Sequence, residues 1–235
     1  MKVLFLTGYM YEEGVYEKYN GGINIYVTQL AKSLAKKKSI SVYALTYGKG
    51  KSNNIDGVKY ISHTYYDLLK TYIGMAKKNI RLTPKKNSLK KLYHVVDYAY
   101  IDQCIKKEKP DIVHIHGVMT GMIQHIQCCK LYGIPVLVTL HGLLSSEGEN
   151  PKTLLSEIEK DFFEYADNER IAISVISSGI KKRASRIYNL KDNSNIQVIG
   201  NGLALNEKKY IKEDIYSKYG LSKGKPILVC IGRIY

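Results

Sequence analysis

The sequence predicts an α/β protein built around a doubly wound, mainly parallel sheet. Short β-branched and aliphatic runs alternate with longer stretches of helical periodicity along the 235 residues. Several short runs, such as Val3–Leu6 and Val136–Leu140, are apolar almost throughout, without the alternation of a half-exposed strand. Such runs are typical of strands that helices cover on both faces. We therefore expect a sheet with helices on each side.

The individual elements follow from these patterns. We expect strands at Val3–Thr7, Ser41–Thr46, Val58–Ser62, Ile112–His116, Val136–Leu140, Ile171–Ile176, Ile196–Ile199 and Ile227–Ile231. We expect helices at Ile23–Lys38, Leu89–Lys107, Thr120–Tyr132, Pro151–Asp167 and Ser178–Tyr188, and a short helix at Ile211–Tyr219. Right-handed crossovers between successive parallel strands then produce the doubly wound arrangement.

Three segments divide the chain. We expect residues 1–205 to form one domain, residues 206–225 to be a polar linker, and residues 226–235 to supply the first strand of a second α/β domain. One strand cannot form a domain, because it has no other layer on which to bury its apolar side chains. We therefore expect that the chain is truncated just as the second domain begins.

Charge and composition limit the partners. The chain has 36 Lys and Arg against 21 Asp and Glu, a net charge of +15, which suits anionic partners without choosing among them. Residues 65–91 are either a basic amphipathic helix on an anionic membrane or a helix packed on its own domain. No apolar run resembles a signal peptide or a membrane span, and the four Cys have no metal-ligand spacing. We expect a cytoplasmic protein with reduced thiols, peripheral on the inner face of the membrane if residues 65–91 bind lipid.

The first candidate site residues are Gly21 and Gly22, directly before the first expected helix. In an open parallel sheet, ligands bind beyond the carboxyl ends of the strands. Adjacent glycines let backbone N–H groups approach an anion closely, and a helix N-terminus favours negative charge. The pair is either a cradle for a diphosphate or acceptor group, or a flexible turn that begins the helix.

Histidines stand at the ends of two central strands. His114 and His116 share one face of their strand, with His116 at the ligand end, and His141 follows the next strand directly before Gly142. An imidazole at this position can donate or accept a proton near neutral pH. Alternatively, these histidines are structural, and one of them is hydrogen-bonded in the core. A metal site needs a third ligand, and none is evident, so we expect no metal.

Two later turns complete the set. Ser177 stands where a helix opens after an expected strand, so its hydroxyl either caps the helix or binds a ligand. Asn201 lies between two glycines after the following strand, in a turn that either contributes to binding or is a plain turn or hinge.

The order of these motifs resembles the family 4 glycosyltransferases. It runs from the Gly-Gly helix start through Pro110-Asp-Ile-Val-His-Ile-His, Val-Thr-Leu-His-Gly, Ile-Ser-Val-Ile-Ser-Ser-Gly-Ile-Lys and Val-Ile-Gly-Asn-Gly to Ile-Leu-Val-Cys-Ile-Gly-Arg. Each motif is loose by itself, but the ordered set is specific and covers essentially the whole chain. The resemblance implies the N-terminal, Rossmann-like, acceptor-side domain of a two-domain GT-B fold.

The resemblance also implies an activity. Such an enzyme transfers a sugar from a nucleotide-diphosphate sugar to a glycan or lipid-linked acceptor, with retention of configuration and without a metal or other cofactor. The family's cleft histidine falls on His141, its Gly-Gly turn on Gly21 and Gly22, and its diphosphate-binding arginine on Arg233, whose guanidinium suits phosphate oxygens. The family's next lysine and paired glutamates would lie beyond Tyr235, so we expect residues 1–235 alone to be inactive.

Other protein classes are excluded or stay open. The sequence has no GxGxxG, GxxxxGK[ST] or GxSxG motif, which excludes a dinucleotide-dependent oxidoreductase, a P-loop NTPase and a hydrolase with a nucleophile elbow. It has no aromatic-basic RNA motif, and we expect no nucleic-acid partner. A non-catalytic module that binds a membrane or a protein partner stays open, as does a regulatory subunit.

Overall fold

The computed structural model describes residues 1–7, 22–45, 53–61, 88–146, 148, 150, 153–169, 171–190, 195–202, 215–222 and 224–228. The side chains of residues 88–97, 168 and 215 are not among the described parts. The chain divides into two compact units, Met1–Gly202 and Leu203–Tyr235. The larger unit contains the entire sheet.

An eight-stranded sheet forms the centre of the larger unit, in the order β3-β4-β2-β1-β5-β6-β7-β8. The strands are β1 (Lys2–Thr7), β2 (Ser41–Leu45), β3 (Asn53–Ile55), β4 (Val58–Ile61), β5 (Ile112–His116), β6 (Val136–Leu140), β7 (Ala172–Val175) and β8 (Ile196–Val198). Of the pairings described, only β3 with β4 is antiparallel. The predicted doubly wound parallel sheet is confirmed.

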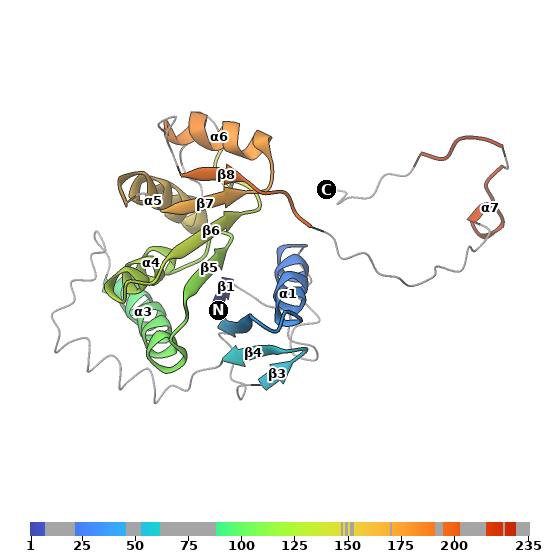
Figure 1. Cartoon of the computed structure of the whole chain (residues 1–235). Helices are drawn as coiled ribbons and strands as arrows, with labels where there is room; N and C mark the ends of the chain where they lie inside the picture. Colours follow the sequence, from blue (N-terminus) through green and yellow to red (C-terminus); the bar gives the residue numbers. More distant parts are fainter. Residues whose placement is uncertain are drawn as a thin grey trace. The chain divides into compact units, whose positions relative to one another are not determined.

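Helices cover both faces of this sheet (Figure 1). They are α1 (Gly22–Ala35) on one face, α3 (Ser88–Glu108), α4 (Met122–Leu131) and α5 (Leu154–Glu169) on the other, and α6 (Ser178–Tyr188), which packs with α5 against β7 and β8. Alternate residues of β1 supply two cores: Val3 and Phe5 pack with α1, whereas Leu4 and Leu6 pack with the helices opposite. Because both faces are covered, residues 3–6 of β1 are all apolar.

The strand order reverses between β1 and β5. From β1 the chain passes to β2 and β4 on one side, and afterwards to β5, β6, β7 and β8 on the other. Thr7 and His116 end the two central strands as partners in register. Ligands of open α/β sheets bind at such a switch point, beyond the carboxyl ends of the strands. A ligand site is therefore expected at this edge of the sheet.

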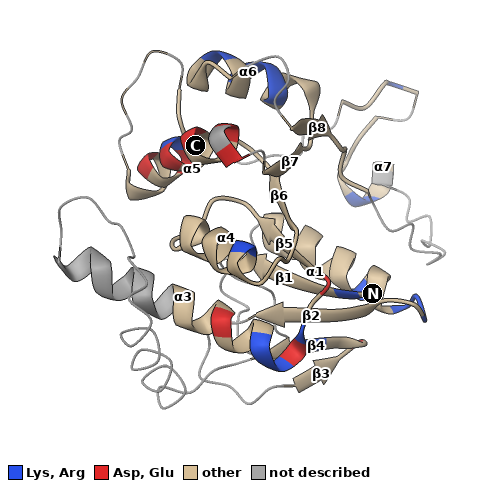
Figure 2. Cartoon of the chain, turned by 60° about the vertical axis from the view of Figure 1, so that its left-hand side comes forward, with Lys and Arg blue, Asp and Glu red and all other residues tan. Residues whose placement is uncertain are grey.

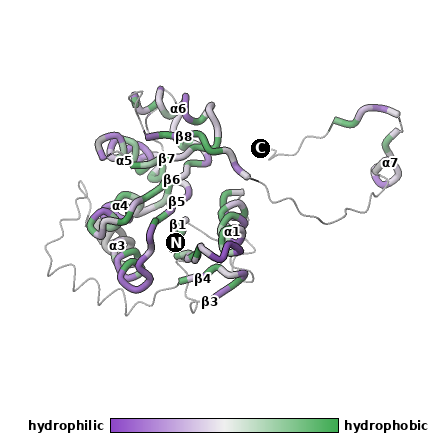
Figure 3. The backbone as a smooth tube through the Cα atoms, viewed as in Figure 1, coloured by the Kyte–Doolittle hydropathy of each residue, from purple (hydrophilic) through white to green (hydrophobic). Residues whose placement is uncertain are grey.

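Among the residues that the structure describes, charged and hydrophilic side chains gather on several helices. Figure 2 shows acidic residues along α5 and basic residues along α6. Figure 3 shows hydrophilic residues along α3 and α5. Among the helices described, none is both long and apolar enough to cross a membrane.

A short strand, β3, was not expected from the sequence. It pairs with β4 through a turn at Asp56 and Gly57, which have positive φ of 52° and 81°. Asn53 and Asn54 are poor strand formers, so the sequence pattern contains no sign of this strand. Residues 65–87 of the expected basic amphipathic segment lie outside the described residues.

The smaller unit has few described residues. It contains α7 (Ile215–Lys218), inside the short helix expected at Ile211–Tyr219. Of the strand expected at Ile227–Ile231, residues 227 and 228 are described and are not in a strand, and the rest lies outside the described residues. The division into domain, linker and second domain stays a prediction.

Candidate functional site

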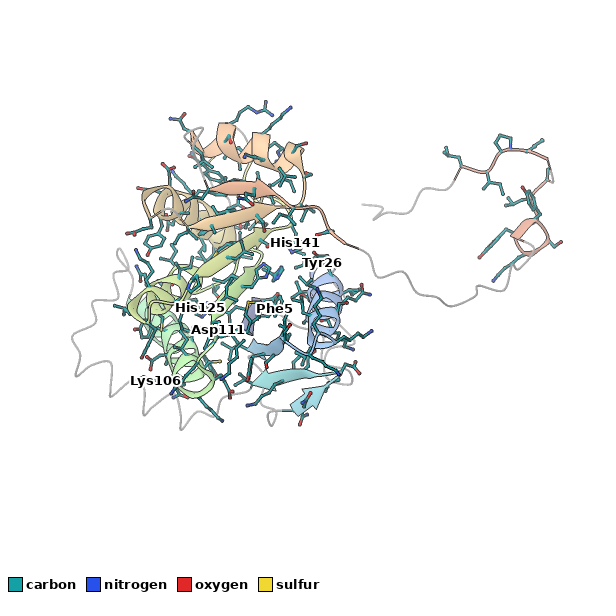
Figure 4. All side chains as sticks on the ribbon, viewed as in Figure 1. Phe5, Tyr26, Lys106, Asp111, His125 and His141 are labelled. Carbon is teal, nitrogen blue, oxygen red and sulfur yellow. The ribbon has the colours of Figure 1, made fainter. Side chains whose placement is uncertain are left out.

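The first turns of α1 lie against the carboxyl ends of β5 and β6. Gly117 turns the chain out of β5 with a φ of 75°, a backbone conformation that favours glycine. A Cβ at Gly117 would lie 4.0 Å from Cδ1 of Ile23 in the first turn of α1. One turn further, the Tyr26 ring stands edge-on to that of His141, with 5.3 Å between centroids (Figure 4). The start of α1 and the ends of both strands therefore form one site.

His116 and His141 are joined by a hydrogen bond. Nδ1 of His116 and Nε2 of His141 are 3.2 Å apart. His116 ends β5 with 2% of its surface exposed, whereas His141 directly follows β6 and is half-buried. His141 is thus the member of the pair that can meet a ligand, and His116 supports it from beneath.

The burial of His116 indicates which nitrogen of each ring carries the proton. Among the described residues, Nε2 of His116 is buried without a hydrogen-bond partner. A buried N–H without a partner costs more than a bare ring nitrogen, because orphaned donors are the rarer case in folded proteins. This favours a proton on Nδ1 of His116, which then donates to Nε2 of His141. His141 consequently carries its own proton on Nδ1 and can donate it to a ligand.

A second polar chain lies in the same layer. Nε2 of His114 is 2.7 Å from Oγ1 of Thr139, which is 2.6 Å from Oγ of Ser174. These three side chains come from β5, β6 and β7, and the ring of His114 lies 3.9 Å from that of His116. The expected alternative that one histidine is hydrogen-bonded in the core is confirmed for His114.

Burial keeps these imidazoles neutral. It lowers the pKa of His114 to about 4, with a further contribution from the charge of His141. It lowers the pKa of His116 to about 2, helped by the charges of His114 and His141. Burial also lowers the pKa of His141. At neutral pH the cluster therefore consists of uncharged hydrogen-bonding groups rather than cations.

The predicted glycines lie at the same edge of the sheet. Gly22 is the first residue of α1 and is exposed, and no atom of the described residues lies within 4 Å of a Cβ placed there. Gly142 is also exposed and directly follows His141. This open space admits a ligand close to the backbone of both residues. Gly21 and Arg233 lie outside the described residues.

Ser177 and Asn201 follow the next two strands. The Ser177 hydroxyl accepts a hydrogen bond from the backbone N–H of Ile180 at 3.2 Å, so the expected capping role is confirmed. Asn201 is exposed in the turn after β8. Strands in a sheet are about 5 Å apart, which separates β7 and β8 from β6 by about 5 and 10 Å. A binding role for either residue stays a prediction.

Three residues of this site were not predicted from the sequence. Tyr26 lies on α1, where its helical spacing resembles that of the core residues. Thr139 and Ser174 are hydroxyl residues within otherwise apolar strands. That interruption was the available signal, since a buried hydroxyl needs a partner.

The described residues were expected to hold no metal ion. Over the described ranges, no three His, Cys, Asp or Glu side chains come together in a way that could hold a metal ion. In the described His116–His141 pair the two rings are hydrogen-bonded to each other, and this bond occupies one ring nitrogen of each histidine. Metal independence stays a prediction.

Comparison with known proteins identifies the family. The family model of Glycosyltransferase Family 4 matches residues 20–207, which is most of the chain. The chain belongs to Glycosyltransferase Family 4. Its family membership and its sheet agree with the Rossmann-like domain of a GT-B fold, as the motif order predicts.

One curated relative and two solved structures agree with this family assignment. It is 27% identical over 137 residues to alpha-maltose-1-phosphate synthase of Mycolicibacterium smegmatis, covering 54% of this chain and 34% of that protein. Among solved structures, a trehalose-6-phosphate synthase has a TM-score of 0.55 at 10% identity, covering 86% of this chain and 49% of that one. A UDP-forming alpha,alpha-trehalose-phosphate synthase from Burkholderia xenovorans, in complex with glucose-6-phosphate, has a TM-score of 0.51 at 11% identity, covering 78% and 42%. The chain thus spans about a third of the curated relative and less than half of each of these two solved structures.

Proposed function

We propose that this family 4 glycosyltransferase transfers a sugar from a nucleotide-diphosphate sugar to an acceptor, with retention of configuration and without a metal ion. The observation that carries the proposal is the His116–His141 pair beside the start of α1, at the carboxyl edge of the sheet. The names of two relatives support the substrate class. One is described as UDP-forming and was solved with a sugar phosphate, and the other is a maltose-1-phosphate synthase.

The donor diphosphate is the group that the start of α1 suits. Transfer leaves negative charge on the departing nucleotide diphosphate and positive charge on the sugar. Backbone N–H groups and the dipole at Gly22 stabilise such an anion without an ion of their own. The resemblance adds Gly21 and Arg233 to this role, and a guanidinium provides two parallel hydrogen bonds to phosphate oxygens. Fixed dipoles of this kind favour the charge that develops in the transition state.

His141 is proposed to orient a hydroxyl of the sugar or the acceptor. Its ring is neutral because burial lowers its pKa. His116 fixes its orientation through Nε2, which leaves Nδ1–H as the donor toward a substrate. In this arrangement His141 contributes a directed hydrogen bond rather than a positive charge. Gly142 has no side chain beside His141, which leaves room for the ring of a sugar substrate.

The test is the variant His141→Ala in a protein that carries both GT-B domains. We expect turnover to fall by about 100-fold, because one hydrogen bond that is made in the transition state is lost. Release of nucleoside diphosphate reports turnover, and circular dichroism checks that the fold is kept. Added imidazole should restore part of the activity. Unchanged turnover would remove His141 from the site.

The chain alone is proposed to be inactive. The family's lysine and paired glutamates would follow Arg233 beyond Tyr235, and they belong to the donor site that the resemblance implies. Purified residues 1–235 should therefore release no nucleoside diphosphate above background. The protein with both domains should be active in excess EDTA, since the proposed chemistry uses no metal.

A cytoplasmic location is proposed for the enzyme, with contact with an anionic membrane as an accessory property. The net charge of +15 and the basic, amphipathic pattern of residues 65–91 favour it. Co-sedimentation with vesicles that contain anionic lipid, compared with neutral vesicles, measures this contact. Equal sedimentation with both vesicle types would reject it.

A further inference from the structure

The segment that follows His141, residues 142–145, is anchored to α5 by one buried carboxylate, that of Glu159. Oε2 of Glu159 accepts a hydrogen bond from the backbone N–H of Leu144 at 2.8 Å. Oε1 accepts one from the backbone N–H of Ser145 at 3.0 Å. Because Leu144 is three residues after His141, these two bonds fix the segment that leaves the candidate site.

Glu159 is fully buried, with 0% of its surface exposed. Carboxylates are almost never buried completely unless they are paired, since removal from water disfavours their charge. The donors that the described residues present to Glu159 are the two backbone N–H groups and the hydroxyl of Tyr188. These three hydrogen bonds are what stabilises the carboxylate, so the segment and Glu159 depend on each other.

Tyr188 brings α6 into the same arrangement. Its hydroxyl donates to Oε1 of Glu159, and its ring stacks on Phe163 of α5 with 4.2 Å between centroids. Burial raises the pKa of Tyr188, and the hydrogen bond to Glu159 raises it further, so the phenol keeps the proton that it donates. Arg183 of α6 also donates to the carbonyl of Ser145, at 3.5 Å. Two helices therefore hold one short segment.

We propose that Glu159 is a positioning residue for sugar transfer, which fixes residues 142–145 and thereby sets the position of the His141 ring. This inference rests on the proposed function, because His141 is the group that is positioned. Leu144, three residues after His141, is apolar and has 52% of its surface exposed. A rigid backbone with an exposed apolar side chain suits contact with a bound acceptor.

The first test measures whether Glu159 anchors the segment. Glu159→Gln replaces one acceptor oxygen by an NH2 group, which cannot accept a hydrogen bond from a backbone N–H. In the 235-residue chain, amide hydrogen exchange of Leu144 and Ser145 should become about tenfold faster or more. Tyr188→Phe is a milder variant, because it removes one donor and keeps the ring that stacks on Phe163. It should give a smaller increase at the same amides.

Asp102→Asn is the matched control. Asp102 is also buried, with 4% exposed, and accepts hydrogen bonds from the Tyr132 hydroxyl and the Lys106 ammonium, each at 2.5 Å, between α3 and α4. This change should leave exchange at Leu144 and Ser145 as in the wild type. Unchanged exchange in both Glu159→Gln and Tyr188→Phe would overturn the anchoring role.

The second test measures whether the anchor serves transfer, in the protein with both domains. Glu159→Gln should raise the acceptor KM and lower kcat, Tyr188→Phe should do so less, and Asp102→Asn should do neither at temperatures where all remain folded. Faster exchange with wild-type kinetics would overturn the positioning role. If the wild-type protein transfers no sugar from any nucleotide sugar tested, the proposed function is wrong and the positioning role with it, whereas the exchange data still decide the anchoring.

Discussion

Mild acid should destabilise the larger unit through the buried histidines at the switch point. Burial lowers the pKa of His114 to about 4 and that of His116 to about 2, from an ordinary value of 6.5. Below pH 6.5 the unfolded chain takes up protons that the folded chain does not. Stability is therefore present in full above pH 6.5 and falls as the pH drops from 6.5 toward the folded pKa values.

The size of the loss follows from the width of that interval. Each pKa unit corresponds to about 1.4 kcal/mol, so lowering the pH from 7 to 5 should cost about 2 kcal/mol for each of the two histidines. Together they should remove about 4 kcal/mol, a large part of the ordinary 5–15 kcal/mol of a folded domain. Below about pH 4 the contribution of His114 levels off as the folded state also becomes protonated.

Urea unfolding at pH 7, 6 and 5 measures this loss, for the wild type and for His116→Phe. The phenyl ring keeps an aromatic side chain against Phe5, with which His116 stacks at 5.5 Å, and it does not titrate. The dependence of unfolding free energy on pH should decrease by about 1 kcal/mol per pH unit between pH 6 and 5 in the variant. Other histidines titrate in both proteins and cancel in the comparison. An identical pH dependence in both would refute the reasoning.

Three further substitutions test the polar chain and the helix cap. Thr139→Val keeps the shape of the side chain but leaves His114 and Ser174 without their shared partner, so urea unfolding should show a loss of about 2–4 kcal/mol, against about 1 kcal/mol for Ser174→Ala. Equal losses would contradict a central role for Thr139. Ser177→Ala removes the cap of α6 and should cost about 1 kcal/mol in the same measurement. A raised donor KM in that variant would show that Ser177 also binds substrate.

The sequence allowed us to predict which site residues are neighbours, because these residues follow the ends of adjacent parallel strands. Parallel strands bring their carboxyl ends to one edge, so residues that follow Ile112–His116 and Val136–Leu140 in the sequence must be neighbours. His116 and His141 therefore meet without any sequence signal that links them directly. Their hydrogen bond and the orientation of each ring were not predictable, because they depend on side-chain rotamers and on the depth of burial.

The role of Glu159 was not predicted, although the sequence contains a sign of it. Glu159 lies three and four residues before Phe162 and Phe163, on the buried stripe of α5 rather than on its charged side. A carboxylate on such a stripe must find donors when the helix packs. Which donors it finds could not be deduced, because they are backbone groups of a segment whose path the amino-acid types do not define.

The face of the sheet that α1 covers has an apolar half and a polar half. On β1, β2 and β4 that face carries residues such as Phe5, Ala44 and Val58, which pack against α1. On β5, β6 and β7 it carries His114, His116, Thr139 and Ser174, linked by hydrogen bonds and ring contacts. Apolar residues would fill the same space, and a polar layer adds stability only when every member has a partner.

The polar half of this face is better explained by His141, which lies at the carboxyl end of its strands. A hydrogen-bonded layer fixes the direction of each donor, which apolar packing cannot do, since dispersion contacts have no preferred direction. The ring contact between His114 and His116 links this layer to His116, which is hydrogen-bonded to Nε2 of His141. A site that acts through oriented dipoles needs them fixed before the substrate arrives, because reorientation during the reaction would add to the barrier. On this argument, Thr139→Val should impair transfer as well as stability, although the Thr139 side chain is buried.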